Sequence, residues 1–308
     1  MQLEFVPRSC PLCGDERSRV FTESNVDPEQ LNESSFSSRK LPEYMHSRMV
    51  ECSGCGLLYA NPALRPEILA GAYKDATFDS QRESQFAAST YRDFLERYLS
   101  EEYRRSALDI GAGDGAFLEQ LLELGFHQVL GIEPSDAPIA AAKPEIRKHI
   151  RRGLFRTGEF AKESFDLITC FQVMEHVPNP VEIVTEAFTL LRPGGMSFMV
   201  VHNCRALSAR MLGTKSPIFD IEHLQLFSKR TCFSLFGRAG FSRITVTPLW
   251  NRYPLQYWIK LFPFPQSLKR TLISVGAMCR LGESIIPLPA GNLAVVGYKP
   301  LTCQQQER

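Results

Sequence analysis

The stretch Ala107-Leu108-Asp109-Ile110-Gly111-Ala112-Gly113-Asp114-Gly115 decides the fold. Its first four residues predict a buried strand, and the glycines that follow predict a tight turn where the backbone can approach a ligand. A helix is expected directly after the turn, over residues 117–122. Read as Gly111-x-Gly113-x-x-Ala116, the same turn satisfies a dinucleotide-binding fingerprint. The turn therefore indicates a nucleotide-binding α/β domain but does not by itself choose the nucleotide.

Strand and helix signals alternate from residue 106 to residue 201, which is the pattern of a doubly wound α/β sheet. The next predicted strand, 128–132, ends at Glu133, whose carboxylate stands where such folds hold a ribose diol. Asp109 lies inside the first strand, an unusual place for a charge unless it meets a ligand or orients the turn. Further strands are expected over 165–170, 196–201, 244–246 and 293–298, with helices over 183–191 and from Ser228 to Gly240.

The order and spacing of these motifs from Leu108 to Val201 resemble those of class I S-adenosylmethionine-dependent methyltransferases. The resemblance implies a seven-stranded Rossmann-like sheet whose last strand, 293–298, runs antiparallel to its neighbours. It also implies that the chain is an enzyme and that S-adenosylmethionine is its cofactor. A nicotinamide-dependent oxidoreductase and a non-catalytic scaffold are the alternatives.

The same resemblance assigns cofactor contacts to individual residues. Glu133 would accept hydrogen bonds from the ribose hydroxyls, because a carboxylate can accept from both. Asp109 would receive the ammonium group of the cofactor, directly or through water. The other candidates are Gly111 and Gly113 for the methionine portion, Phe171 beside the cofactor, and Leu154 and Phe155 for adenine. For the last two, plain core packing is equally open.

Four of the nine cysteines form two Cys-x-x-Cys pairs, each followed by a glycine that allows the left-handed backbone of a metal-binding knuckle. This spacing predicts one Zn²⁺ held by four thiolates, and because four thiolates leave no open position the zinc is expected to be structural. Residues 14–51 carry few apolar side chains, so the metal should supply much of the local folding energy. The predicted ligands are Cys10, Cys13, Cys52 and Cys55.

The charge balance excludes some classes of function. The 35 lysines and arginines against 34 acidic residues leave a net charge of +1, so nothing attracts phosphate backbones in general and nucleic-acid binding is not expected. The N-terminus lacks the basic-then-apolar order of a signal peptide, and no apolar run approaches the roughly 18 residues of a membrane span. We expect a cytoplasmic protein with reduced thiols.

Two domains are expected: a zinc-binding module with its linker over 1–75, and a methyltransferase domain over 76–308. A helix over 86–105 is predicted at their junction. Residues 250–291 form an apolar and aromatic insertion before the last strand, expected to be helical and mainly basic in its charges. We expect this insertion to be a lid or a homodimer contact. The alternative is a surface for a lipid-linked substrate or an anionic membrane.

A base is needed wherever the methyl acceptor must lose a proton, and three histidines compete at the carboxyl ends of the strands. Glu222-His223 lies on a loop, the usual location of acceptor-specific groups. His223 is therefore predicted to be the base and Glu222 to orient or support it; alternatively, the pair only anchors the helix at Ser228. His176 is expected to shape the cofactor site and His202 to be structural. A solvated or structural role is expected for His46, His127 and His149.

A cysteine module ahead of such a core is also similar to bacterial sugar methyltransferases, including nucleotide-linked deoxysugar C-methyltransferases. There a Glu-His pair before an aromatic-Ser sequence provides the base, and Glu222-His223 and Phe227-Ser228 match it. Leu224 stands where an aromatic residue is usual, and the large C-terminal domain of those enzymes is absent. The implied acceptor is a sugar, a nucleotide sugar, or a glycan or lipid-linked intermediate. O-methylation of a secondary metabolite is the alternative.

Overall fold

The computed structural model describes residues 4–27, 29, 44–75 and 77–301. Its centre is a seven-stranded sheet with the order β12-β13-β10-β9-β6-β7-β8. β13 pairs antiparallel with both of its neighbours, and the pairs from β10 to β8 are parallel. The strands are β6 (Ser106–Ile110), β7 (Gln128–Glu133), β8 (Ile150–Arg152), β9 (Phe165–Phe171), β10 (Leu191–His202), β12 (Ser242–Pro254) and β13 (Ile285–Tyr298). The predicted doubly wound sheet with an antiparallel last strand is confirmed.

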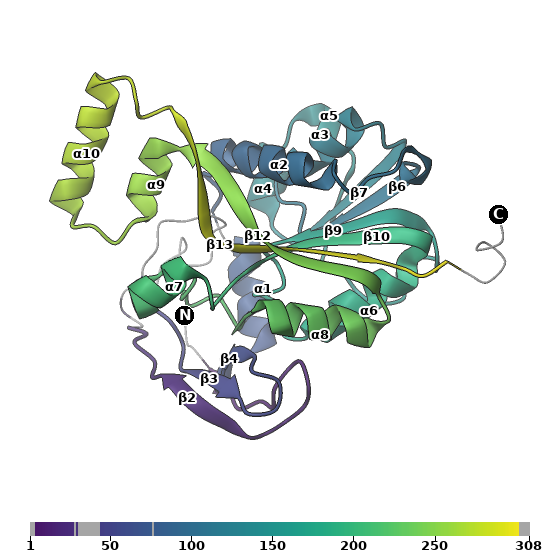
Figure 1. Cartoon of the computed structure of the whole chain (residues 1–308), viewed down its shortest axis with the longest axis horizontal. Helices are drawn as coiled ribbons and strands as arrows, with labels where there is room; N and C mark the ends of the chain where they lie inside the picture. The colour runs from purple at the N-terminus through teal and green to yellow at the C-terminus, as the bar shows by residue number, and fades with distance from the viewer. Residues whose placement is uncertain (1–3, 28, 30–43, 76, 302–308) are drawn as a thin grey trace.

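Helices cover both faces of this sheet (Figure 1). One face carries α2 (Gln81–Leu95) and α3 (Ala116–Glu123), and the other carries α6 (Pro180–Leu190) and α8 (Lys229–Ala239). Two short helices, α4 (Asp136–Ala141) and α5 (Pro144–Arg147), connect β7 to β8. The sheet is therefore the middle layer of three, and its central strands β6, β9 and β10 are buried on both sides.

The core forms because side chains alternate across the sheet. Along β10, Phe198 and Val200 pack with Phe94 of α2, whereas Met199 and Val201 pack on the α6 and α8 side. Strands buried on both faces read as nearly continuous apolar runs. This explains why the central strands are easily found in the sequence.

The ends of two helices test the sequence-based boundaries. α8 begins at the predicted cap, where Ser228 and Thr231 form a capping box, and it ends at Gly240 with φ of 100°. The helix predicted over 86–105 is wrong in extent: α2 spans Gln81–Leu95, and a short 3₁₀ turn at Glu101–Tyr103 follows. The chain needs this break to turn into β6.

The N-terminal module is a small sheet that the main domain completes. Its order is β11-β4-β3-β2, and β11 comes from the segment after β10. The strands are β2 (Ser18–Thr22), β3 (Met49–Cys52), β4 (Leu58–Ala60) and β11 (Gln225–Leu226), with β1 (Phe5–Val6) paired to β5 (Ala63–Leu64) and α1 (Pro66–Asp75) following. One hydrophobic cluster joins Leu58 and Leu64 to Phe219 and Ile221. The boundary at residue 75 stays a prediction, and residues 28 and 30–43 of the polar stretch 14–51 lie outside the described residues.

The insertion before the last strand is narrower than predicted. β12 runs on to Pro254 and β13 begins at Ile285, with Tyr253 paired to Ile286, so the flanks of 250–291 are strands. The helices α9 (Leu255–Leu261) and α10 (Gln266–Met278) sit at the tip of this long hairpin, beyond the sheet (Figure 1). Among the described residues, no helix is long and apolar enough to cross a bilayer.

Candidate active site

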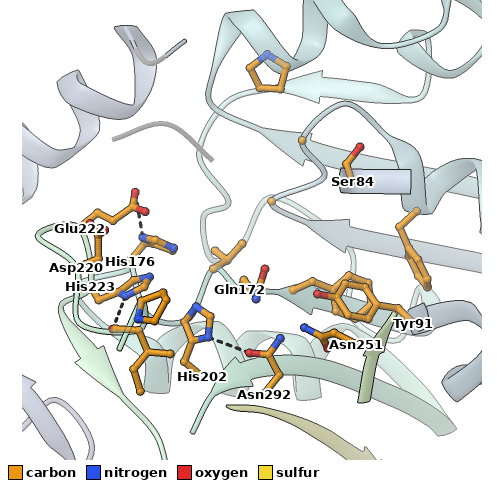
Figure 2. Close-up of a pocket in the computed structure, with 18 of the residues that line it drawn as sticks. Ser84, Tyr91, Gln172, His176, His202, Asp220, Glu222, His223, Asn251 and Asn292 are labelled. Atoms are coloured by element: carbon orange, nitrogen blue, oxygen red, sulfur yellow. Dashed lines mark hydrogen bonds and ion pairs between the residues drawn. The ribbon is translucent and has the colours of Figure 1, made fainter. Parts of the chain in front are cut away.

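A cavity of about 750 Å³ opens at the carboxyl ends of β6, β7, β9 and β10. Ligands of open α/β sheets bind at this edge, where the strand order reverses. Two groups of polar side chains line it. One is the pair of carboxylates Asp109 and Glu133, at the ends of β6 and β7. The other is a group of histidines gathered on one side (Figure 2). The two groups suit two ligands held next to each other.

Asp109 is a buried carboxylate, and no cationic side chain of the described residues pairs with it. It is 2% exposed, and its Oδ1 accepts a hydrogen bond of 2.7 Å from the hydroxyl of Thr169. Burial raises the pKa of Asp109 to about 6; the Thr169 hydrogen bond opposes this rise and the charge of Glu133 adds to it. A cation placed here would relieve both the desolvation and the repulsion.

Glu133 is fixed by backbone amides at both oxygens. Oε2 accepts from Gly113 at 2.9 Å and Oε1 accepts from Ser135 at 2.8 Å. Burial raises the pKa of Glu133, and these hydrogen bonds oppose the rise. An ionised carboxylate offers about four lone-pair sites, so Glu133 can still accept from hydroxyl groups of a ligand.

The glycine turn leaves room for that ligand. Gly111 and Gly113 have φ of 78° and 57°, where side chains are strained. A Cβ on Gly111 would lie 2.2 Å from Cγ2 of Val173, whereas a Cβ on Gly113 would meet nothing within 4 Å. Phe171 also lines the cavity and packs against Phe117 with ring centroids 4.6 Å apart. Leu154 and Phe155, the adenine candidates, line the cavity too.

On the other side of the cavity, Nδ1 of His176 faces the side chains of Tyr73 and Glu222. The hydroxyl of Tyr73 lies 2.8 Å from Nδ1 of His176, and Oε2 of Glu222 lies 3.8 Å from the same nitrogen. Burial and the negative charge of Glu222 raise the pKa of Tyr73. The phenol therefore stays protonated near neutral pH and is available as a donor.

The hydrogen bonds of His223 define its tautomer. Nδ1 of His223 lies 2.8 Å from the carbonyl oxygen of Ile218. A carbonyl oxygen only accepts, so Nδ1 carries the proton and the lone pair of the neutral ring is at Nε2. The ring centroid of His223 lies 4.9 Å from those of both His176 and His202 (Figure 2).

His202 is held neutral beside these two. Its Nδ1 lies 2.9 Å from Oδ1 of Asn292, and burial lowers its pKa to about 4. The remaining histidines lie elsewhere: His46 is buried with Nδ1 at 3.0 Å from the carbonyl oxygen of Ser47, and His127 is exposed. The structure thus brings together the three histidines that the sequence placed at the carboxyl ends of the strands.

Several polar residues of this cavity are absent from the sequence-based candidates. Among them are Tyr73, Asp220, Asn251 and Asn292. Asn292 is 4% exposed in the otherwise largely apolar strand β13, so the argument that singles out Asp109 applies to it too. Asn251 is 6% exposed in β12, a strand of mixed polarity that does not single it out. Tyr73 gives no such signal, because it reaches His176 from α1 through tertiary contacts.

The four predicted metal ligands come together in the N-terminal module. The sulfurs of Cys10, Cys13, Cys52 and Cys55 all lie within 4.8 Å of one another, with Cys10 to Cys55 and Cys13 to Cys52 at 3.5 Å. In each knuckle the glycine amide donates to the carbonyl of the first cysteine, Gly14 to Cys10 at 2.8 Å and Gly56 to Cys52 at 3.0 Å. Four sulfurs on two such turns form a donor set suited to a tetrahedral ion.

Comparisons with known proteins agree with this arrangement. A family model described as a methyltransferase domain matches residues 78–246. A ubiquinone biosynthesis O-methyltransferase of Acinetobacter baumannii is 36% identical over 106 residues, covering 32% of this chain and 44% of that protein. One of Stutzerimonas stutzeri is 31% identical over 119 residues, covering 36% of this chain and 51% of that protein. The chain therefore spans about half the length of the curated relatives it matches.

Solved structures share the fold at low identity. A SAM-dependent methyltransferase from Archaeoglobus fulgidus has a TM-score of 0.47 at 16% identity, covering 71% of this chain and 98% of that one. Phosphoethanolamine N-methyltransferase 2 of Haemonchus contortus has a TM-score of 0.43 at 17% identity, covering 69% of this chain and 52% of that one.

Proposed function

This chain belongs to the methyltransferase-domain family, and from that premise we propose that it transfers a methyl group from S-adenosylmethionine to a small-molecule acceptor. One observation carries the proposal: the buried carboxylates Asp109 and Glu133 line the same cavity as His223 and His176. The carboxylates suit the cofactor, and the histidines suit an acceptor that must lose a proton.

The charge of the site supports S-adenosylmethionine over a nicotinamide dinucleotide. Asp109 would receive the ammonium group and Glu133 the ribose hydroxyls, while the open space at Gly113 would admit the methionine portion. A pyrophosphate at this turn would instead face two buried negative charges. When bound, S-adenosylmethionine supplies an activated methyl group on a sulfonium.

We assign the base to Nε2 of His223. This atom holds the lone pair of the neutral ring, because Nδ1 faces the carbonyl of Ile218. It would take the proton of the acceptor, which leaves the acceptor atom an electron pair with which to bond the methyl carbon. Glu222 and Tyr73 flank His176 next to this base, and Glu222 would stabilise positive charge that develops on the two imidazoles.

The lining of the cavity favours an acceptor with a hydroxylated head and an apolar carrier. Polar side chains gather around the histidines, whereas the mouth includes Leu207 and Met211, which are 71% and 76% exposed, and Phe262, directly after α9, at 43%. A sugar or glycan linked to a lipid combines both properties. The names of the relatives, ubiquinone biosynthesis O-methyltransferases, support O-methylation as the second candidate.

The tip of the β12–β13 hairpin supports contact with an anionic membrane. On α10 the buried residues are Lys269 and Gly276, whereas Leu268, Val275 and Met278 are exposed. The nearby charges are mainly basic, and Glu283 already pairs with Arg82. Co-sedimentation with vesicles of phosphatidylglycerol and phosphatidylcholine at low salt would show this contact, and a protein that stays in the supernatant would exclude it. A homodimer through the same face is the competing outcome.

We also propose that the four cysteines hold one structural Zn²⁺. Zn–S bonds of about 2.3 Å in a tetrahedron place sulfurs about 3.8 Å apart, close to the 3.5 Å of two of the pairs. Hydrogen bonding from the Cys55 thiol lowers the pKa of Cys10, which favours the thiolate form that a metal ion needs. Four reduced cysteines at one site support a cytoplasmic location.

The experiment is a methyl-transfer screen with labelled S-adenosylmethionine over nucleotide sugars, lipid-linked sugars and prenylated phenols. The wild-type protein should label one class, and His223→Gln should lower turnover on it by roughly 10² to 10⁴ while cofactor affinity stays unchanged. The exposed His127→Gln is the matched control. A wild-type protein that neither binds S-adenosylmethionine nor labels any acceptor would overturn the proposed function, and near-normal turnover of His223→Gln would remove the base from His223.

A further inference from the structure

Arg8 connects the N-terminal module to the segment that carries His223. Its Nη2 donates to the carbonyl of Leu224 at 2.6 Å and to Oε1 of Gln225 at 3.0 Å. Its Nε donates to the carbonyl of Ala60 in β4 at 3.1 Å. Arg8 lies two residues before Cys10, and Leu224 directly follows His223. The guanidinium of Arg8, next to a cysteine knuckle in the sequence, therefore joins the small sheet to the loop that carries His223.

Gln225 extends this connection to His176. Its side chain is fully buried, and its Nε2 donates to the carbonyls of Met174 at 2.5 Å and Val177 at 2.8 Å. These two carbonyls flank His176 in the sequence. Because Oε1 of Gln225 accepts from Arg8, the amide has partners on both sides and its orientation is fixed.

Backbone hydrogen bonds also join the small sheet, the segment of His176 and the segment of His223, a meeting point called the junction below. The amide of Leu224 donates to the carbonyl of Glu175 at 2.7 Å, and the amide of Ala60 donates to the carbonyl of Leu224 at 2.8 Å. These hydrogen bonds hold the segments ending in His176 and His223 side by side, with β4 against the second of them. This leaves their rings 4.9 Å apart in the cavity.

We propose that Arg8 and Gln225 are positioning residues for His176 and His223, so that the N-terminal module sets the geometry of the acceptor site. The inference rests on the proposed function, since that assigns the base to His223. A displacement of about 1 Å at a reacting group can cost roughly 10²-fold in rate. Side chains that fix two main-chain segments against each other are placed to prevent such a displacement.

Arg238 provides a matched control for Arg8. Its Nη1 donates to the carbonyl of Leu12 at 2.6 Å, so it also joins the module to the main domain through an arginine–carbonyl hydrogen bond. It contacts the knuckle from α8 and, among the described residues, its side chain forms no hydrogen bond to either histidine segment. Loss of Arg238 therefore removes a tether of the same kind without touching the junction at Gln225.

The test uses the full chain with its metal bound and with its histidine rings labelled with ¹³C. The ring signals are measured by NMR and assigned with His→Gln variants. In Arg8→Met and in Gln225→Met, the ring signals of His176 and His223 should shift or broaden, and those of His127 and His149 should not. Cofactor affinity should stay within about twofold, because the cofactor residues lie apart from the junction. With an acceptor in hand, kcat should fall about 10²-fold while KM for S-adenosylmethionine holds.

Three outcomes overturn the inference. One is that the ring signals of His176 and His223 are the same in Arg8→Met and Gln225→Met as in the control Arg238→Met. Another is that all six histidines move together. The third is loss of cooperative unfolding in both variants, which would give the bridge a role in global stability instead. If the wild-type chain transfers no methyl group, the proposed function fails, but the ring signals still decide the positioning role.

Discussion

The backbone amide of Gly113 donates a hydrogen bond of 2.9 Å to Oε2 of Glu133, which ties the glycine turn after β6 to the end of β7. The other oxygen of Glu133 is held by the amide of Ser135. A carboxylate fixed at both oxygens is already oriented before a ligand arrives, so binding does not have to order it. Glu133 therefore holds the shape of the turn, and it is already oriented for the ribose contact that we propose.

Glu133→Ala should weaken S-adenosylmethionine binding by about 5- to 150-fold, which corresponds to the roughly 1 to 3 kcal/mol of hydrogen bonds that are lost or left unpaired. Isothermal titration calorimetry measures the change. Glu119→Ala is the control, because Glu119 pairs with Lys143 and Gln85 and does not line the cavity. Equal affinities for Glu133→Ala and wild type would remove Glu133 from the ribose site.

Cofactor affinity should fall as the pH drops below about 6. The pKa of Asp109 is raised to about 6, so the carboxylate is ionised at pH 7 and becomes protonated, hence neutral, at lower pH. A cationic ammonium group binds the ionised form, and each further pH unit should therefore cost up to about tenfold in affinity. Dissociation constants between pH 5 and 7 measure this, and Asp109→Asn should flatten the profile. An affinity that is the same at pH 5 and pH 7 would argue against this contact.

Glu175→Gln should stabilise the protein at neutral pH. Glu175 is fully buried, with Oε2 lacking a hydrogen-bond partner among the described residues, and burial raises its pKa from 4.5 to about 7. Between these values the folded state keeps a proton that the unfolded state releases, so stability falls as pH rises from 4.5 to 7 and the penalty persists above pH 7. Replacing the carboxylate of Glu175 with a neutral amide should therefore raise the free energy of unfolding at neutral pH by on the order of 3 kcal/mol.

Urea unfolding at pH 5, 6, 7 and 8 measures that effect. The stability difference between Glu175→Gln and wild type should grow with pH, whereas the exposed Glu96→Gln should track the wild type throughout. Parallel curves for Glu175→Gln and wild type would show that Glu175 keeps an ordinary pKa in the fold.

Purified protein should contain one equivalent of zinc, and Cys52→Ser should lose it, because three thiolates leave the tetrahedral set incomplete. Elemental analysis measures the metal. Cys279→Ser, at an exposed cysteine away from the cluster, should retain the full equivalent. A wild-type protein that folds its N-terminal module without metal would contradict the zinc site.

The central sheet could be predicted because its signals are local. β6, β7, β9 and β10 contain apolar runs bounded by turns, and α8 is bounded by Ser228 and Gly240. The edge strand β8, with two exposed arginines in three residues, gives no such signal and was not predicted. The hairpin flanks could not be predicted in this way. Tyr253 pairs with Ile286 across two intervening helices, and no local periodicity encodes a pairing at that separation.

The residues of the candidate site also fall into those that local sequence signals predict and those that only tertiary packing brings together. Asp109, Gly113 and Glu133 lie in one continuous βαβ motif, so their proximity follows from the motif itself. Tyr73 and Asn292 reach the histidines from α1 and β13, which only the packed fold brings together. Sequence reasoning placed the cysteine module apart from the acceptor site, whereas β11 and Arg8 join the two.

The sheet order β11-β4-β3-β2 also fixes a sequence of events on the ribosome. β4 is made early, but the strand that covers its edge, Gln225–Leu226, is made much later. At translation rates of about 5 to 20 residues per second, the delay is roughly 10 to 30 s. Throughout that interval β4 is an open edge, the kind of surface that pairs with other chains. The cysteines can gather during synthesis, but the histidines meet only after β11 has docked.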